Sequence, residues 1–487
     1  MNAKKIAYIL IFSFAYISIL YLSFQRFNNL NANVADLGFF LNNFKNIYKT
    51  PSLAFENHFQ LLYFVWGLIF LIIKNNLIAS IIILFLQVSV VFYIIYQVGL
   101  KLGKFYSILL IFYLPIWSLL LFDFHFDHLM VPISFFYLIF LNEKKYYKSL
   151  SIISLSIFVK ETYIFYLFLA SIIYLILYFQ EKDKKTKKIL YNCFFLSILF
   201  GILFTLLSIF LITLYSSDNH LTQTVNLFSI FSIGDLIILK KKFIFFLIIF
   251  GSFAFLPLIN FRFVILASPL ILVAFFSTEE NYFNYNTHYA AATIIPAIFG
   301  LKDILKKYRY RWLRIIVLSV TILINIYFSN SIISRFFWTD KIDSLTLNSY
   351  LLTERKIKIK YYIKKELSAL IKENIVISSQ NNVFTESMIG SKKILPFPMG
   401  YIKNNYKDIQ TGQIFIYENK HELLPDIIIV DKKIDMFLFD RSCGYYFKVC
   451  TNIKHKKNYE NIYDYLKNDK RYSLISRYDK FEIYKKK

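Results

Sequence analysis

Long apolar runs alternate with short basic segments over the first 330 residues, and this pattern stops near residue 335. A membrane-spanning helix needs about 20 mostly apolar residues, although proteins with many spans tolerate shorter ones. The pattern therefore predicts an all-α polytopic membrane protein with about eleven transmembrane helices. The predicted spans are 6–24, 77–98, 105–122, 129–141, 148–159, 162–180, 189–215, 243–259, 263–277, 289–301 and 313–330.

Basic segments between these runs predict the orientation of the helices, because short cytoplasmic loops are enriched in Lys and Arg. We expect four of them to be cytoplasmic: KLGK at 101–104, NEKKYYK at 142–148, EKDKKTKK at 181–188 and KDILKKYRYRWLR at 302–314. For these four loops to lie on the same side, residues 59–73 cannot cross the membrane. They lie at its interface instead, or enter it and return on the same side. The first run follows the basic start MNAKK without a small-residue cleavage site, so we expect an uncleaved span.

The predicted orientation places several polar segments together on the non-cytoplasmic side. They are residues 25–76, 122–128, 160–161, 216–235 and 277–289. Lysines 240–242 fall on that side too, against the usual bias. Either the span count near 222–259 differs, or these lysines meet an anionic ligand or lipid phosphate.

Residues 335–487 have the pattern of a small α/β domain, and the predicted orientation of the preceding spans places it outside the cytoplasm. Three segments have strand character and two have helical character. The strand segments are NIVISSQ (374–380), PDIIIVD (425–431) and RYSLISRYDKFEIYK (471–485), and the helical ones are 354–373 and 459–469. We therefore expect two domains, a transmembrane domain over 1–334 with a first external loop at 25–76, and an extracytoplasmic domain over 335–487.

Composition excludes an ordinary soluble protein, because 57% of the residues are hydrophobic. The formal net charge of +25 invites a nucleic-acid interpretation, but the basic residues of the membrane half fall in topology-setting loops and no nucleic-acid-reading motif accompanies them. We expect attraction to anionic membrane lipids and no nucleic-acid partner. Cys193 lies in an apolar run, whereas Cys443 and Cys450 could pair in an oxidising compartment.

Carboxylates are scarce at the start of the chain, where Asp36 and Glu56 are the two acids among the first 122 residues. Asp36 either caps the amphipathic run that follows it or acts as a general base near the lipid interface. His58 is either an interfacial anchor or part of a polar site with Asp36. Both residues belong to the predicted first external loop.

The segment FDFHFDH (122–128) places two aspartates and two histidines in an apolar context. On a helix, Asp123 and Asp127 would share one face, and His125 and His128 another. Oxygen ligands suit Mg²⁺ or Mn²⁺ and imidazoles suit Zn²⁺, but no familiar zinc spacing is present. Substrate hydroxyl or phosphate binding is the interpretation we favour, with metal binding and a structural polar turn as alternatives.

Two further pairs of polar residues lie at predicted membrane boundaries. Lys160 and Glu161 interrupt apolar sequence, where charges are costly and indicate either a functional site or an ion pair with another span. His288 and Tyr289 begin a predicted span and could hydrogen-bond a phosphate or form an interfacial aromatic pair. Walker, Rossmann, nucleophile-elbow and CxxC motifs are absent from the sequence.

Five motifs in order carry a resemblance to a known family. They are ADLGFF…NNFKNIY, ENHFQ, FDFHFDH, VKE and NTHYAAATIIPAIFG. Over about residues 30–330 the chain resembles a bacterial and archaeal family of multi-pass membrane proteins of unknown function (DUF2079-like), and parts of the tail look similar as well. Two positions depart from that family's pattern: Ala35 stands where an aromatic residue is usual, and Asp127 stands where Pro is usual.

That family is similar to the GT-C superfamily of polyprenyl-phosphate-dependent glycosyltransferases, which implies a function and roles for individual residues. Asp36 would be the general base on an acceptor hydroxyl, while Lys160, His288 and Tyr289 would bind the donor phosphate. Other polar residues would line the substrate cavity: Glu56, His58, Asp123, His125, Asp127, His128 and Glu161. The implied partners are a polyprenyl-phosphate-sugar donor, membrane lipids and a glycan, lipid or protein acceptor.

The resemblance leaves other functions open. No cofactor is required, because a lipid phosphate is already a fair leaving group, and a divalent metal remains an option. The location implied is the cell membrane. A transporter or flippase of a lipid-linked or anionic solute is the main alternative, since charges within a membrane also mark transport paths. A non-catalytic envelope protein is the third.

Overall fold

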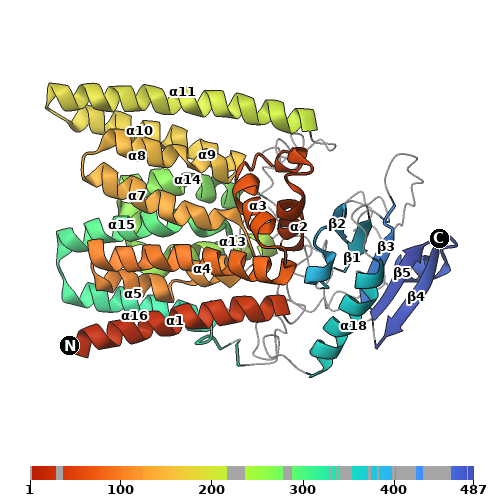
Figure 1. Ribbon diagram of the computed structural model, residues 1–487. Coiled ribbons are helices and arrows are strands. Elements are labelled where there is room, and N and C mark those ends of the chain that lie inside the picture. Colours follow the sequence, from red (N-terminus) through yellow and green to blue (C-terminus); the bar gives the residue numbers. More distant parts are fainter. Residues whose placement is uncertain are drawn as a thin grey trace. The chain divides into compact units, whose positions relative to one another are not determined.

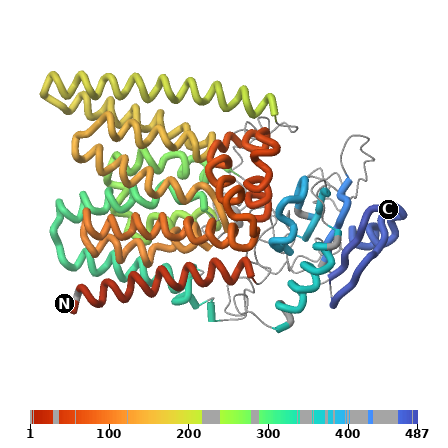
Figure 2. Tube along the Cα trace, in the orientation of Figure 1, coloured from red at the N-terminus to blue at the C-terminus, as the bar shows by residue number. Residues whose placement is uncertain are grey.

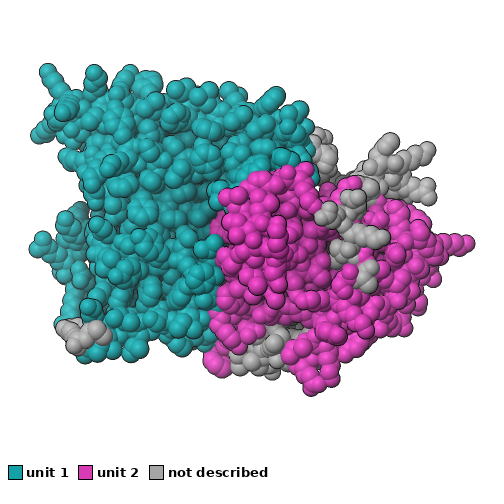
Figure 3. Space-filling view, viewed as in Figure 1, with its two compact units in different colours: residues 1–20, 50–65, 85–335 teal, residues 21–49, 66–84, 336–487 magenta. Residues whose placement is uncertain are grey.

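The computed structural model forms two compact units, which Figure 3 colours separately. The described residues are 3–28, 37–56, 58–121, 123–215, 236–277, 288–329, 331–335, 337–338, 354–370, 375–380, 383–397, 401, 424–431, 462–479 and 481–487. Unit 1 contains residues 1–20, 50–65 and 85–335, and unit 2 contains residues 21–49, 66–84 and 336–487. The division into domains at 334 and 335 stays a prediction.

Unit 1 is helical, and its helices run alongside one another (Figures 1 and 2). α10 packs against α11, and α15 packs against α7 and α14. The helices that lie wholly in this unit are α5 Lys104–Phe112, α6 Leu114–Leu121, α7 Met130–Asn142, α8 Tyr146–Ser154, α9 Ser156–Val159, α10 Phe165–Gln180, α11 Lys184–Tyr215, α13 Leu236–Ile249, α14 Phe261–Phe276, α15 Ala291–Tyr308 and α16 Arg311–Phe328. Short 3₁₀ turns also belong to this unit: η2 Pro51–Ala54, η3 Phe126–Leu129, η4 Glu161–Ile164, η5 Gly251–Phe253, η6 Leu256–Ile259 and η8 His288–Ala290.

Three helices contribute residues to both units, because the unit boundaries fall inside them. They are α1 Ala3–Asn28, α3 Leu62–Ile72 and α4 Asn76–Lys101. Within unit 1, the Tyr8 hydroxyl of α1 hydrogen-bonds the Ser107 hydroxyl of α5 at 3.0 Å. The Tyr16 hydroxyl bonds that of Ser89 in α4 at 2.9 Å. These pairs satisfy polar atoms between otherwise apolar helices, as a membrane environment requires.

Five helices in the described part of the chain are long and apolar enough to cross a membrane, and the bent α5–α6 pair makes six if it is one span. The five are Lys5–Asn28, Asn76–Lys101, Glu161–Gln180, Lys184–Tyr215 and Arg311–Phe328. Shorter apolar helices are Leu62–Ile72, Phe126–Asn142, Tyr146–Val159 and Phe261–Phe276. The prediction of a polytopic helical membrane protein is confirmed with five or six candidate spans, and the number eleven stays a prediction.

The bend of 57° between α5 and α6 has a local cause. Pro115 in the first turn of α6 has no N–H to donate to the Ile111 carbonyl. The Trp117 indole Nε1 donates to that oxygen instead, at 2.8 Å. Asn325 Nδ2 donates to the Phe112 carbonyl at 2.7 Å. Side chains thus satisfy the carbonyls around the bend, as an apolar environment requires.

The expected span at 243–259 is not one helix, which corrects the sequence interpretation. α13 ends at Ile249, and the turns η5 and η6 occupy the rest of the segment. Lys242, for which either a different span count or contact with an anionic ligand or lipid phosphate was open, is buried, and its Nζ donates to the Phe275 carbonyl at 2.7 Å. An ammonium group there is favourable because the last carbonyls of α14 have no partner within the helix.

Unit 2 contains a mixed five-stranded sheet in the order β2-β1-β3-β5-β4. β1 pairs in parallel with β2 and β3, and β5 pairs antiparallel with β3 and β4. Its elements are α2 Phe39–Asn46, α18 Glu354–Leu370, η9 Glu386–Met388, β1 Val376–Ser379, β2 Lys393–Pro396, β3 Ile427–Asp431, β4 Tyr472–Tyr478 and β5 Phe481–Lys486. A small mixed sheet in the tail is therefore confirmed, with β4 inside the predicted segment 471–485 and β5 extending one residue beyond it.

Asparagines of α2 and α4 bind the loop that precedes β2 within unit 2. Asn42 Nδ2 donates to the Ser391 carbonyl at 3.1 Å, and its Oδ1 accepts from the Gly390 N–H at 2.8 Å. Gly390 has φ +101°, a conformation that L side chains adopt only with strain. Asn76 Nδ2 donates to the Ile389 carbonyl at 3.0 Å. Residues near the two ends of the chain therefore fold as one unit.

Glu386 lies at the start of η9 with a side chain that is 8% exposed. Burial alone would raise the pKa of its carboxyl group. The lysines at 3.6 Å (Lys360) and 3.0 Å (Lys364) outweigh burial and hold that pKa below its usual range. A carboxyl with a lowered folded-state pKa stabilises the fold above its unfolded pKa of about 4.3, and this stabilisation disappears as the pH falls.

Glu386→Gln is expected to destabilise unit 2 by about 1–2 kcal/mol at pH 7, because Lys360 keeps a partly buried charge without its carboxylate. The difference should shrink as the pH falls below about 4.3, where the unfolded wild-type carboxyl takes up a proton, and vanish below the lowered folded-state pKa. Thermal unfolding of the detergent-solubilised chain across pH measures this difference. Glu354→Gln, at an exposed carboxylate of α18, is the control, and a difference that persists at low pH would contradict the ion-pair explanation.

Candidate functional site

Polar side chains of unit 1 gather where three connections between helices meet. η3 joins α6 to α7, η4 joins α9 to α10, and η8 begins α15. Contacts link η3 with η8, and α9 contacts both η3 and η4. The predicted site segments at 122–128, 160–161 and 288–289 are therefore close in the folded chain.

Residues 123–129 form a turn between helices, so the helical arrangement in which Asp123 and Asp127 would share one face does not apply. Residues 123–125 have no helical hydrogen bonding, and η3 begins at Phe126. Asp123 has φ +108°, and its carbonyl accepts from Gln87 Nε2 at 3.0 Å. This reversal separates the two aspartates and leaves Asp127 as the one that enters the cluster.

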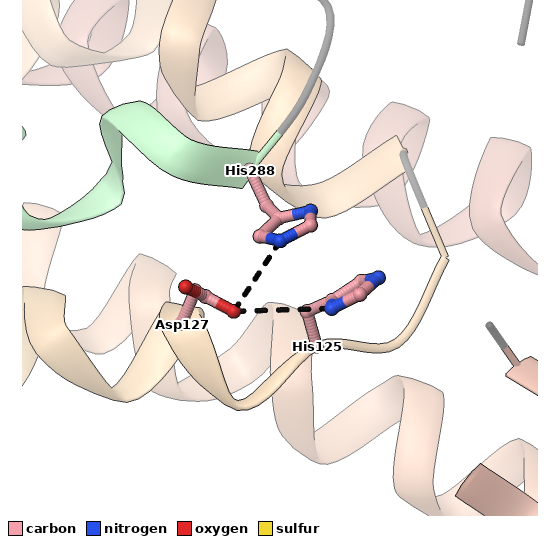
Figure 4. Close-up of side chains that lie close together, drawn as sticks. All are labelled: His125, Asp127 and His288. Atoms are coloured by element: carbon pink, nitrogen blue, oxygen red, sulfur yellow. Dashed lines mark ion pairs between the residues drawn. The ribbon is translucent and has the colours of Figure 1, made fainter. Parts of the chain in front are cut away.

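His125, Asp127 and His288 form the centre of the site (Figure 4). Asp127 Oδ2 lies 3.8 Å from His125 Nδ1 and 3.6 Å from His288 Nε2. The two imidazole rings stack with centroids 3.7 Å apart and an interplanar angle of 14°. Side-chain exposure is 13%, 8% and 5% for the three residues in chain order. The carboxylate is thus largely removed from solvent beside two imidazoles.

Tyr163 completes the surroundings of Asp127, and sequence reasoning did not identify it. Its hydroxyl donates a hydrogen bond to Asp127 Oδ1, the carboxylate oxygen not directed at the histidines. η4 positions it, since the Tyr163 N–H donates to the Lys160 carbonyl at 2.9 Å. The Lys160 ammonium adds electrostatic attraction to Asp127. Tyrosine occurs 38 times in the chain, so the residue type alone gave no indication of a functional role for Tyr163. Its position close to Lys160 and Glu161 was the only indication in the sequence.

Glu161 points to a different partner from its neighbour Lys160. Its Oε1 pairs with His58 Nδ1 at 2.8 Å, and its Oε2 accepts from the Phe59 N–H at 3.0 Å. The exposed fractions of the His58 and Glu161 side chains are 40% and 22%. These two bonds hold residues 58–59 beside η4, so the His58 and Glu161 side chains, both predicted to line a substrate cavity, bind each other.

The remaining candidate residues have different positions. His128 is fully buried, and its Nδ1 is 2.5 Å from the His125 carbonyl, so it supports the turn. The Tyr289 ring lies 4.4 Å from the ring of His288, centroid to centroid. Glu56 is half-buried just after η2. Asp36, the expected base, lies outside the described residues, as do Cys443 and Cys450.

The geometry allows two kinds of chemistry. Two imidazole nitrogens and one carboxylate oxygen within 4.8 Å of one another can ligate a metal ion. Imidazole and ammonium groups can also stabilise an anion such as a phosphate. Among the described residues, this is the one group of three or more His, Cys, Asp or Glu side chains with ligand atoms that close.

Comparison with models of protein families gives a match over most of the chain. A protein-family model described as Predicted membrane protein (DUF2079) matches residues 28–423. That range includes every candidate site residue named above. No curated protein matches the chain.

Proposed function

This chain belongs to the DUF2079 family of predicted membrane proteins, and from that premise we propose that it is a membrane glycosyltransferase of the GT-C type. It takes a sugar from a polyprenyl-phosphate donor and transfers it to a glycan, lipid or protein acceptor of the cell envelope. The reaction takes place at the external face of the cell membrane, where the C-terminal domain also lies. The proposal includes about eleven membrane-spanning segments.

One observation carries the proposal: a buried cluster of charged and polar side chains inside an apolar helical unit. His125, Asp127, His288 and Tyr163 come from three separate connections, and Lys160 adds a cation. Ionisable groups in such surroundings are costly and mark sites where a polar substrate or ion is handled. A donor with an apolar tail and a phosphate head matches both features of this part of the molecule: the tail suits the apolar helices, and the phosphate suits the polar cluster.

The chemical step needs a base, an electrophile and a leaving group. The acceptor hydroxyl oxygen attacks the anomeric carbon of the sugar, and its proton passes to the Asp36 carboxylate. The bond between that carbon and the phosphate oxygen breaks, and the electron pair leaves with the lipid phosphate. Lys160 and His288 stabilise the charge that develops on the departing phosphate, with Tyr289 beside His288.

The experiment uses the full chain reconstituted in liposomes with undecaprenyl-phosphate donors that carry radiolabelled hexoses or pentoses. An envelope extract supplies acceptors, and the readout is the release of undecaprenyl phosphate together with labelled product. Asp36→Asn is expected to lower turnover about 100-fold, which is within the range for loss of a general base. Asp183→Asn at the exposed start of α11 is the control, because asparagine caps a helix as well as aspartate does.

Two results would reject parts of this proposal. Normal turnover by Asp36→Asn removes Asp36 from its role. Movement of intact donor across the liposome membrane, without release of undecaprenyl phosphate, rejects glycosyl transfer in favour of transport.

A further inference from the structure

We infer that His125, Asp127 and His288 bind one divalent transition-metal ion of the Zn²⁺ or Mn²⁺ class. Their ligand atoms lie within 4.8 Å of one another. They come from two segments 160 residues apart in the sequence, which the fold brings together at η3 and η8. The inference does not rest on the proposed glycosyl transfer, because it concerns binding of the ion alone.

The distances fit an ion better than direct hydrogen bonds. Asp127 Oδ2 lies 3.6 Å and 3.8 Å from the histidine nitrogens, beyond the usual N–H···O range of about 2.7–3.2 Å. An ion with ligand bonds of about 2.1 Å holds neighbouring ligand atoms roughly 3.0–3.4 Å apart. A contraction of a few tenths of an ångström would bring Asp127 Oδ2 and each histidine nitrogen to this spacing, and all three ligand atoms already lie within 4.8 Å of one another. Because the rings stack at 14°, one imidazole also has to turn so that its ring plane contains the ion.

Charge balance favours a cation at this position over an anion alone. The Asp127 carboxylate lies within 4 Å of His288 Nε2 and of His125 Nδ1, so its negative charge faces the space beside both rings and attracts a cation there. Two stacked imidazolium groups 3.7 Å apart would repel each other, whereas metal ligation uses neutral imidazoles. A divalent ion satisfies the carboxylate and both rings together.

Tyr163 supports the ligand arrangement as a positioning residue. Its hydroxyl bonds Asp127 Oδ1, which leaves Oδ2 directed toward the two histidines (Figure 4). Metal-binding carboxylates commonly have such a hydrogen bond, and its loss typically weakens metal affinity 10–100-fold. Tyr163→Phe removes this bond while keeping the aromatic ring.

The ligand set also indicates which ion binds. Two nitrogens and one oxygen suit Zn²⁺ or Mn²⁺, whereas Ca²⁺ and Mg²⁺ prefer oxygen ligands throughout. Three protein ligands leave at least one coordination position for water or a substrate oxygen. An ion there would give a phosphate-bearing substrate a direct contact in addition to those from the protein side chains.

The test measures metal binding by the purified full chain in detergent, with an affinity tag that contains no histidine. After removal of metals by a chelator, the protein is dialysed against Zn²⁺ or Mn²⁺ at defined free concentrations, and bound metal is measured by elemental analysis. We expect one ion per chain for at least one of the two metals. His125→Ala and His288→Gln should each weaken binding at least 100-fold, and Tyr163→Phe 10–100-fold.

His58→Ala is the matched control, because this histidine pairs with Glu161 outside the cluster, and it should keep wild-type metal affinity. Gel filtration and circular dichroism verify that each variant is folded. Absence of stoichiometric binding by the wild type overturns the inference, as does unchanged binding by folded His288→Gln. Metal binding without any sugar transfer would reject the proposed function and leave the metal site in place.

Discussion

Asp127→Asn is expected to lower sugar transfer on the order of 1,000-fold and metal affinity at least 100-fold, with little change in stability. The amide is the same size as the carboxylate and can keep the Tyr163 hydrogen bond, but it brings no negative charge to the two histidines. Loss of a preorganised electrostatic contact costs 100- to 1,000-fold in turnover, and loss of a charged metal ligand adds to this. The turnover assay and the dialysis experiment measure the two effects on one preparation.

The control for this result is again Asp183→Asn, which should retain full turnover and full metal content. If Asp127→Asn lost metal but transferred sugar normally, the ion would have no part in the reaction. If it kept both, Asp127 would be a structural residue of the η3 turn.

Glu482→Ala is expected to cause the largest loss of stability, about 3 kcal/mol, in unit 2. This carboxylate in β5 is fully buried, and Oε1 accepts from Arg477 Nε at 2.6 Å. Oε2 accepts from the hydroxyls of Tyr463 at 2.5 Å and Tyr484 at 2.7 Å. Burial and this carboxylate raise the pKa of Tyr463 to about 12, so the hydroxyl remains a donor. Removing the shared acceptor leaves several donors unsatisfied.

Hydrogen exchange of the β4 and β5 amides in the full chain measures this loss, together with thermal unfolding. Glu354→Ala, at an 81% exposed carboxylate in α18, should leave both unchanged. Equal exchange rates in wild type and Glu482→Ala would show that the sheet does not depend on this carboxylate.

The strands of unit 2 were predictable because their sequences carry strong local signals. IIIVD has four consecutive β-branched residues and VISS begins with two, and the sheet buries both strands, so that the local sequence and the tertiary structure agree. β2, with the sequence KILP, was missed because four residues between a lysine and a proline give no clear signal. The break after Ile249 was missed because hydropathy continues across it, whereas the backbone does not.

Four residues of the cluster, but not Tyr163 or the geometry, could be singled out from the sequence. His125, Asp127, Lys160 and His288 stand out in sequence as polar groups among apolar residues. Which aspartate of FDFHFDH enters the cluster depends on the positive φ of Asp123, and no periodic pattern encodes that angle. The Tyr163–Asp127 bond joins residues 36 positions apart, so it becomes visible only once the helices pack.

Dividing the chain at a single position does not separate the two compact units. The chain changes unit at five places, after residues 20, 49, 65, 84 and 335. A fragment that begins at residue 336 would lack Asn42 and Asn76, whose amides bind the loop before β2. A soluble version of unit 2 therefore has to be assembled from discontinuous pieces, with α2 and the start of α4 joined to the sheet by designed linkers.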